Sequence, residues 1–221
     1  MKIGVLGAGM MTEALAAGWA RAGHDVLIGG RTPDKTVDLA ERIGARAGTL
    51  REAAEFGDAV LIAVLLAGLE ETLRAAGAPE GTLAGKTVID CGNAVDISDF
   101  SQVTYEGGSS MAEQVARLSP GAHVVKAFNQ AHAAVWRMRP PVFEGRPLAV
   151  PFAGGQGGKA TARALIADLG AEPLDAGDIK QARHLEAMAI IVIRLLFSGY
   201  DPLSVFAFSS PDRADEAITS R

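Results

Sequence analysis

The chain has 221 residues, which is enough for one large domain or for a domain with a small appendage. Its composition, 48% hydrophobic and 21% charged, is ordinary for a soluble globular protein, and a net charge of −5 gives no electrostatic basis for binding nucleic acid or an anionic membrane. The single cysteine, Cys91, excludes an intrachain disulfide and a multi-cysteine metal site.

The sequence also predicts that the chain does not enter a membrane. Its longest apolar run, residues 187–197, is interrupted by Arg194 and is too short to span a bilayer. A strand-like run at residues 2–6 leaves no room for a signal peptide. We therefore expect no membrane or nucleic-acid partner, and the single cysteine predicts a protein of the reducing cytoplasm.

Strand-like and helix-like segments alternate along the chain. Short apolar runs predict strands at residues 2–6, 25–28, 45–47, 58–65, 87–90, 123–127, 148–153 and 172–175. Helical periodicity predicts helices at residues 12–22, 34–43, 50–56, 69–75, 110–118 and 159–169, and a long apolar helix at 179–197. This alternation predicts an α/β fold with a doubly wound, mostly parallel sheet.

The first strand leads into a glycine-rich turn of the kind that binds dinucleotides. Gly7 permits a tight strand-to-helix turn, and Gly9 removes a side chain that would keep a pyrophosphate from the backbone. The helix that begins near Met10 directs its free N–H groups and positive dipole end at the phosphates. The third position of the pattern holds Thr12, a small residue whose hydroxyl could bond a backbone carbonyl or a phosphate oxygen. This context favours dinucleotide binding over a purely structural turn.

The end of the second strand indicates which dinucleotide is bound. An NAD-selective domain usually places Asp or Glu there, whereas this chain continues Gly-Gly-Arg-Thr at residues 29–32. Arg31 can pair with a ribose 2′-phosphate, Thr32 can add a hydroxyl, and Lys35 can reach the same phosphate from the next helix. The alternative is that these are ordinary solvated surface residues. We predict NADP(H) rather than NAD(H).

Later strands should end at the same edge of the sheet and complete the site. Val64 and Leu65 could pack against the cofactor or belong to the core. Asn93 could hydrogen-bond the nicotinamide ribose or carboxamide, or only form a turn. Residues 128–132 follow the sixth strand and are the best place for groups that contact nicotinamide or substrate.

Two histidines are candidate proton donors, because an imidazole titrates near neutral pH. His132 is our first choice for the catalytic residue and His184 the second, while the alternative, which the residues alone favour, is a structural or surface role for each. We interpret Asp175, Asp178 and Glu186 as turn or surface carboxylates. No metal-ligand spacing and no Ser/His/Asp or Cys/His arrangement can be assembled.

Five stretches together resemble a known family. They are residues 1–10, 30–33, 124–129, 174–177 and 182–186. On these the chain resembles the NADP oxidoreductases of the coenzyme F-420-dependent type, whose N-terminal domain is also similar to that of pyrroline-5-carboxylate reductase. The resemblance covers nearly the whole chain.

The resemblance implies a Rossmann domain at residues 1–177 and a C-terminal helical segment at 178–221 that closes the acceptor site. It places the NADP(H) phosphates on the turn formed by Gly7, Ala8, Gly9, Met10 and Met11. It places the 2′-phosphate on Arg31 and its neighbours and the nicotinamide near residues 129–133, which include Asn129 and Ala131. It also implies a homodimer formed through the C-terminal parts, and direct hydride transfer between stacked rings where the acceptor is a deazaflavin.

The leading hypothesis is therefore an NADPH-dependent reductase. The chain departs from the family pattern at Thr12, at residues 65–66, at 130–132 and after Phe197, and most of these positions surround the expected nicotinamide end. The acceptor could be a deazaflavin, a flavin, or a small carbonyl or imine compound. The alternatives are an NADP(H)-binding sensor or regulatory protein without turnover, and a subunit whose Rossmann fold serves only assembly.

Overall fold

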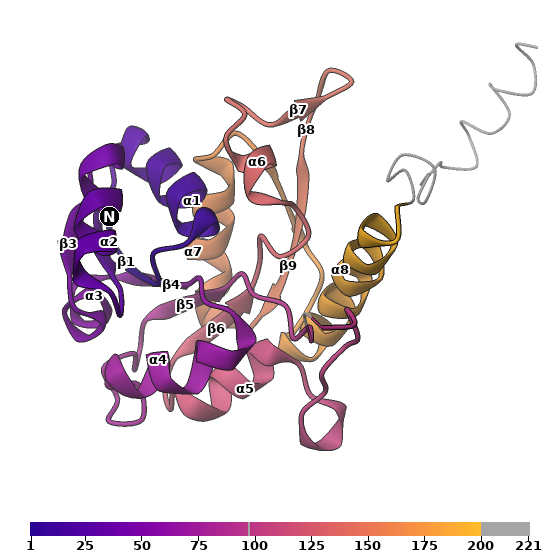
Figure 1. Ribbon diagram of the computed structural model, residues 1–221, viewed down its shortest axis with the longest axis horizontal. Coiled ribbons are helices and arrows are strands. Elements are labelled where there is room, and N and C mark those ends of the chain that lie inside the picture. The colour runs from indigo at the N-terminus through magenta and orange to yellow at the C-terminus, as the bar shows by residue number, and fades with distance from the viewer. Residues whose placement is uncertain (97, 200–221) are drawn as a thin grey trace, which may run out of the picture.

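A single eight-stranded sheet forms the centre of the computed structural model, which describes residues 1–96 and 98–199 (Figure 1). In spatial order the strands are β10 (Glu172–Asp175), β9 (Ala149–Gly154), β6 (His123–Lys126), β5 (Thr87–Asp90), β4 (Ala59–Ile62), β1 (Lys2–Leu6), β2 (Asp25–Gly29) and β3 (Arg46–Gly48). Strands β1 to β6 are parallel to one another. Strand β9 runs antiparallel to β6, and β10 pairs with β9 in the parallel direction. The predicted doubly wound, mostly parallel α/β fold is confirmed.

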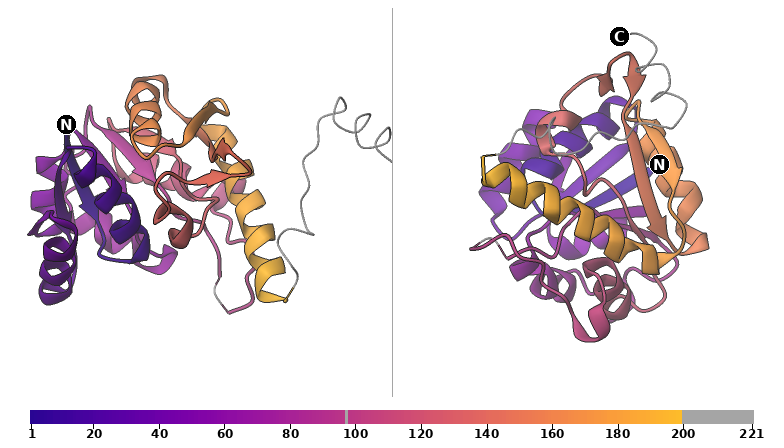
Figure 2. Two further views of the ribbon diagram at one scale, coloured as in Figure 1. Left: turned by 90° about the horizontal axis from the view of Figure 1, so that it is seen from above. Right: turned by 90° about the vertical axis from the view of Figure 1, so that its right-hand side faces the viewer.

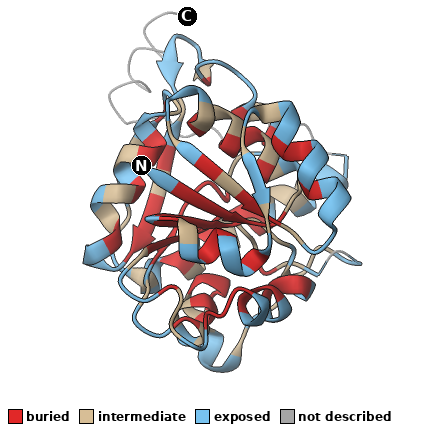
Figure 3. Ribbon diagram, turned by 90° about the vertical axis from the view of Figure 1, so that its left-hand side faces the viewer, coloured by how far each residue is buried: buried red, intermediate tan, exposed pale blue. Residues whose placement is uncertain are grey.

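Helices cover both faces of the sheet. One face carries α1 (Met10–Arg21), α2 (Pro33–Ile43) and α7 (Gln156–Ala167), and the other carries α3 (Leu50–Phe56), α4 (Leu69–Ala75) and α5 (Met111–Leu118). Alternate strand residues divide between the two cores, as Val5 and Leu6 do in β1. Because the central strands are buried on both faces, they are continuous apolar runs (Figure 3).

The last described helix, α8 (Ala182–Phe197), crosses the edge at which the parallel strands end (Figure 2). The remaining elements are short: α6 (Ala133–Trp136), the hairpin β7 (Val142–Phe143) and β8 (Arg146–Pro147), and the 3₁₀ turns η1 (Leu66–Gly68), η2 (Glu106–Gly108) and η3 (Ile179–Gln181). None of the helices in residues 1–96 and 98–199 combines the length and apolar character that crossing a bilayer requires.

The structure differs from the sequence prediction in several places. The strand predicted at 58–65 ends at Ile62, because β1, its hydrogen-bonding neighbour, ends at Leu6 opposite it. The helix predicted at 179–197 is the turn η3 followed by α8. Helix α6 and the β7–β8 hairpin were not predicted. Residues 200–221 of the predicted C-terminal segment lie outside the described residues.

Candidate nucleotide-binding and active site

The turn between β1 and α1 has the conformation that its glycines predict. Gly7 has φ +119°, and a Cβ atom there would lie 2.4 Å from the carbonyl oxygen of Ala63. Gly9 has an ordinary φ of −104°, and a Cβ atom there would meet nothing within 4 Å among the described residues. Since Gly9 is also the N-cap, it has no side chain to occupy the first N–H groups of α1. Open space therefore lies in front of a helix N-terminus.

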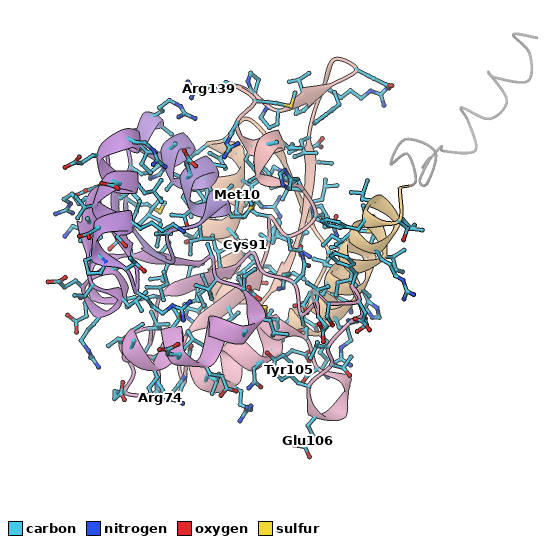
Figure 4. The ribbon with its side chains drawn as sticks, viewed as in Figure 1. Met10, Arg74, Cys91, Tyr105, Glu106 and Arg139 are labelled. Atoms are coloured by element: carbon cyan, nitrogen blue, oxygen red, sulfur yellow. The ribbon has the colours of Figure 1, made fainter. Side chains whose placement is uncertain are left out.

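The other residues of this turn divide between core and surface. Ala8 and Met11 are half-buried against the core, whereas Met10 is 62% exposed (Figure 4). Thr12 is fully buried, and its hydroxyl donates a hydrogen bond to the carbonyl oxygen of Gly7 at 2.8 Å. Of the two partners that the sequence left open for Thr12, the structure provides the backbone carbonyl. Thr12 thus fits the third position by stabilising the turn itself.

Three exposed polar residues follow β2. Arg31 Nη1 lies 3.0 Å from Glu71 Oε2, and both side chains are more than 60% exposed. Thr32 is the N-cap of α2, and Lys35 lies in the first turn of that helix. An exposed ion pair contributes little free energy, so the Arg31 guanidinium can exchange Glu71 for another anion at little cost.

Val64 and Leu65 follow the end of β4 and have different environments. Val64 is half-buried and packs against the core on the α4 side. The side chain of Leu65 is 72% exposed, which is unusual for a leucine beside a central strand. Leu65 is therefore available to cover a ligand at this edge, while Val64 contributes at least partly to the core.

The loops after β5 and β6 are joined by a pair of asparagines. Asn93 Nδ2 donates to the backbone oxygen of Asn129 at 2.9 Å, and Asn129 Nδ2 donates to Asn93 Oδ1 at 2.9 Å. Asn129 Nδ2 also donates to the carbonyl oxygen of Leu185 in α8, at 3.1 Å. The structure thus brings together two residues predicted separately to contact the nicotinamide, and links both to α8.

Asn129 is placed by a strained residue. Phe128 precedes it with φ +65°, a left-handed conformation that is costly for an aromatic residue. The Phe128 ring is buried between Trp19 and Trp136, at centroid distances of 5.8 and 5.1 Å and with near-perpendicular planes. This packing holds the strained backbone in place.

Neither candidate histidine is buried. His132 is the N-cap of α6, and its Nδ1 accepts a hydrogen bond from Ala134 N at 3.2 Å. That bond requires an unprotonated Nδ1, so the neutral ring carries its proton on Nε2. Ala131 beside it is half-buried, and His184 is exposed on α8. In this neutral form, Nε2–H of His132 can donate a hydrogen bond to a ligand.

The interpretation of Glu186 as a turn or surface carboxylate is wrong, because its side chain is fully buried. Glu186 lies 2.7 Å from Lys126 Nζ and accepts hydrogen bonds from the backbone N–H groups of Met111 and Ala112, at the N-terminus of α5. Those two N–H groups have no partner within α5 and lie at its positive dipole end, so they stabilise the carboxylate.

Lys126 is the centre of this buried charge cluster, which we define as Lys126, Asp90 and Glu186. Its ammonium group bonds Asp90, Glu186 and the carbonyl oxygen of Gly92. Burial alone lowers the pKa of a lysine, but the two carboxylates outweigh it and raise the pKa of Lys126. Asp90 Oδ1 also accepts from Gly92 N at 2.8 Å. The cluster thus fixes the turn that carries Asn93.

Cys91 lies within that turn but is not a nucleophile. Burial, reinforced by the charge of Asp90, raises the pKa of the Cys91 thiol to about 12. The thiol therefore stays protonated at neutral pH. Among residues 1–96 and 98–199, no group of three or more His, Cys, Asp or Glu side chains is placed to hold a metal ion.

Comparisons with known proteins show which family this chain resembles. A family model described as "NADP oxidoreductase coenzyme F420-dependent" matches residues 2–94. A solved structure described as a putative F420-dependent NADP-reductase from Arthrobacter sp. FB24 is 31% identical, with a TM-score of 0.78, covering 90% of this chain and 94% of that one. A reductive aminase from Aspergillus terreus, solved with NADPH and ethyl levulinate, shares the fold at 24% identity and a TM-score of 0.66, covering 90% of this chain and 62% of that one.

A curated relative is much longer than this chain. Rat metalloreductase STEAP3 is 29% identical over 201 residues, which are 91% of this chain but 38% of the relative. Only part of that protein therefore corresponds to the present one. Taken with the near-complete match to the Arthrobacter structure, the findings make this chain a member of the coenzyme F420-dependent NADP oxidoreductase family and an NADP-dependent oxidoreductase.

Proposed function

We propose that the chain is a reductase that passes a hydride from NADPH to an acceptor held between the loop after β6 and α8. The observation that carries the proposal is the carboxyl edge of the sheet. The open space at Gly9 and the Asn93–Asn129 pair both belong to loops that follow parallel strands, and Asn129 bonds the carbonyl oxygen of Leu185 in α8. Figure 2 shows α8 crossing this edge of the sheet. The acceptor is a deazaflavin, a flavin, or a small carbonyl or imine compound.

The predicted cofactor residues fit an extended dinucleotide along this edge. The pyrophosphate would lie on the turn of residues 7–11, with the 2′-phosphate on Arg31, Thr32 and Lys35. Val64 and Leu65 would pack against the bound cofactor between these two ends of the site. Asn93, Asn129 and Ala131 would contact the nicotinamide end.

NADPH, when bound, supplies the hydride, and the protein binds and aligns both reactants. For a ring acceptor, alignment and exclusion of water suffice. For a carbonyl or imine acceptor, a proton must also be delivered. We assign that step to the His132 imidazolium, which gives its Nε2 proton to the acceptor and becomes the neutral ring whose Nδ1 accepts from Ala134 N.

Replacing Arg31 with alanine is expected to weaken NADPH binding by about 1.5–3 kcal/mol, since a charge-assisted hydrogen bond to the 2′-phosphate is lost. Binding of NADH should not change. Calorimetric titration with both dinucleotides measures the ratio of affinities, and Glu71→Gln is the matched control because it removes only the exposed partner of Arg31. An unchanged ratio in Arg31→Ala would rule out the 2′-phosphate assignment.

The replacement His132→Asn is expected to lower turnover of a carbonyl or imine acceptor roughly 10²–10⁴-fold, the usual contribution of general acid catalysis. Asparagine is a good N-cap, so α6 should stay folded. Consumption of NADPH is followed across pH with carbonyl, imine and flavin acceptors. Turnover of a flavin should be unaffected, and an unchanged pH profile with a carbonyl acceptor would exclude His132 as the proton donor.

We also propose a homodimer formed through α8. Its side chains Ile191, Leu196 and Phe197 are 52%, 41% and 71% exposed, and a second copy of the chain would cover them. The cytoplasm stays the expected compartment of such an enzyme.

A further inference from the structure

A closed network of hydrogen bonds joins α8 to the two loops of the candidate site. Glu186 of α8 lies 2.7 Å from Lys126 Nζ, which donates to the carbonyl oxygen of Gly92 at 2.7 Å. The next residue, Asn93, is bonded twice to Asn129. Asn129 Nδ2 then donates to the backbone of α8 one residue before Glu186, at 3.1 Å. The network therefore fixes α8 and the loops after β5 and β6 relative to one another.

Glu186 also ties this closed network to a fourth element, α5. Its Oε1 accepts from Lys126 Nζ and from Ala112 N at 3.2 Å, and its Oε2 accepts from Met111 N at 2.9 Å. A carboxylate can satisfy these three donors because both of its oxygens only accept hydrogen bonds. The side chain is fully buried, so water does not compete for these bonds.

The polar anchors of α8 all lie at its N-terminal end. Among the described residues, the hydrogen bonds and ion pairs that join α8 to other elements start from Arg183, Leu185 and Glu186. The helix continues to Phe197, whose side chain is exposed, across the edge at which the parallel strands end (Figure 2). Since a helix is stiff, the direction of its far end depends on how the anchored end is held.

Charge balance alone does not account for Glu186. Lys126 already has Asp90 as a counter-charge, and one carboxylate suffices to neutralise one ammonium group. A second buried carboxylate adds a desolvation cost of its own. What Glu186 adds is the connection of α8 to β6 and α5.

We propose that Glu186 is a positioning residue for hydride transfer. It holds α8 across the carboxyl edge of the sheet and, through Lys126 and Gly92, holds the asparagine pair. The inference rests on the proposed function, which places the nicotinamide beside Asn93 and Asn129. Glu186 acts without touching either reactant. A misplacement of about 1 Å in such a step can slow it roughly 10²-fold, so loosening α8 should lower the rate and spare the affinity for NADPH.

Glu186→Gln tests this role with little risk to folding. A glutamine has one accepting oxygen and one NH₂ group, so in either orientation its NH₂ group faces only donors, on α5 or on Lys126. At least one anchor of α8 is therefore lost. Lys126 keeps Asp90, so the interior retains a balanced ion pair and the chain should fold.

Glu52→Gln is the matched control. Glu52 also accepts hydrogen bonds at a helix N-terminus, from Thr49 N at 2.7 Å, but it belongs to α3, far from α8 (Figure 1). Glutamine is also accepted in a capping box, so this variant should behave as the wild-type chain. Should Glu186→Gln not fold, Glu186→Asp takes its place, because aspartate keeps the charge but is too short to reach all three donors.

The first measurement is backbone hydrogen exchange of the full chain, with no ligand present. In Glu186→Gln we expect exchange about tenfold faster in residues 187–197, from the loss of a hydrogen bond to a charged group. Faster exchange should extend to residues 91–96 and 128–132, and should be absent from α2 and α3. Calorimetric titration should give an NADPH affinity within about twofold of the wild-type value, since the phosphates of NADPH supply most of its binding energy.

The second measurement is turnover with riboflavin or 5-deazariboflavin as the probe acceptor. We expect kcat of Glu186→Gln to fall at least about tenfold. NADPH deuterated at C4 of the nicotinamide should show a larger isotope effect on kcat than in the wild-type chain, because hydride transfer becomes the slow step. A smaller fraction of folded enzyme would lower kcat but leave the isotope effect unchanged.

Four results would overturn the inference. They are wild-type exchange in α8 of Glu186→Gln, exchange that rises equally in all elements, wild-type kcat in that variant, and a loss of NADPH affinity larger than the loss of kcat. A wild-type chain that binds NADPH but reduces no acceptor would instead refute the proposed function, and the exchange measurement would then decide whether Glu186 positions α8.

Discussion

Replacing Lys126 with methionine is expected to destabilise the folded protein by about 3–5 kcal/mol, the usual cost of breaking a buried ion pair. Methionine fills a similar volume, but Asp90 and Glu186 would face each other in the interior without a counter-charge. Urea unfolding measures the change. Lys86→Met is the control, because Lys86 Nζ bonds two backbone carbonyls at the end of α3 and is only half-buried.

Two further measurements separate charge from packing. Adding Glu186→Gln to Lys126→Met should recover part of the lost stability, because it removes one of the uncompensated carboxylates. The folded pKa of Lys126 is raised above the reference value of 10.5, so its contribution to stability is fully present below that pH and is lost only as pH rises through the folded pKa. The wild-type chain should thus keep the full contribution of Lys126 to stability from neutral to mildly alkaline pH. A deficit under about 0.5 kcal/mol, within the usual range of surface substitutions, would contradict the cluster's energetic role.

Gly9→Ala is expected to fold normally and to lose most of its affinity for NADPH. The backbone angles of Gly9 suit alanine, and its Cβ atom would meet none of the described residues. The methyl group would instead occupy the space in front of α1 where the pyrophosphate is proposed to lie. Loss of one charge-assisted hydrogen bond costs about 1.5–3 kcal/mol, which is roughly 10- to 150-fold in affinity.

Gly7→Ala is the contrasting variant. Its Cβ atom would lie 2.4 Å from the Ala63 carbonyl at a φ of +119°, so this substitution should lower the unfolding temperature. Thermal unfolding and calorimetric titration of both variants give the comparison. A Gly9→Ala protein that binds NADPH as the wild-type chain does would show that the cofactor does not approach this turn.

Local patterns in the sequence predicted most of the fold. The strand from residue 2 to 6, the glycine turn and the helix that ends at Ile43 depend on neighbours within a few positions. The position at which α2 ends is also determined by a neighbouring residue, since Gly44 adopts the left-handed conformation that ends a helix. The hairpin of residues 142–147 and the four-residue α6 were missed because elements of that length carry too little periodicity.

The buried charge cluster could not be predicted in the same way. Asp90, Lys126 and Glu186 belong to three elements, and Glu186 lies 75 residues after the backbone N–H group of Met111 that it binds. A helical carboxylate is usually on a solvated face, which is why its burial was not expected. One signal was present: Lys126 and Asp90 each end an apolar strand that is buried on both faces, and a charge in that position needs a partner.

Phe128 has a spectroscopic consequence. The chain has two tryptophans, and both indole rings contact the Phe128 ring in edge-to-face geometry. The tryptophan emission of the protein therefore arises from one aromatic layer, next to the loop that carries Asn129. A ligand that changes this loop can be detected in the unmodified protein, without a fluorescent label.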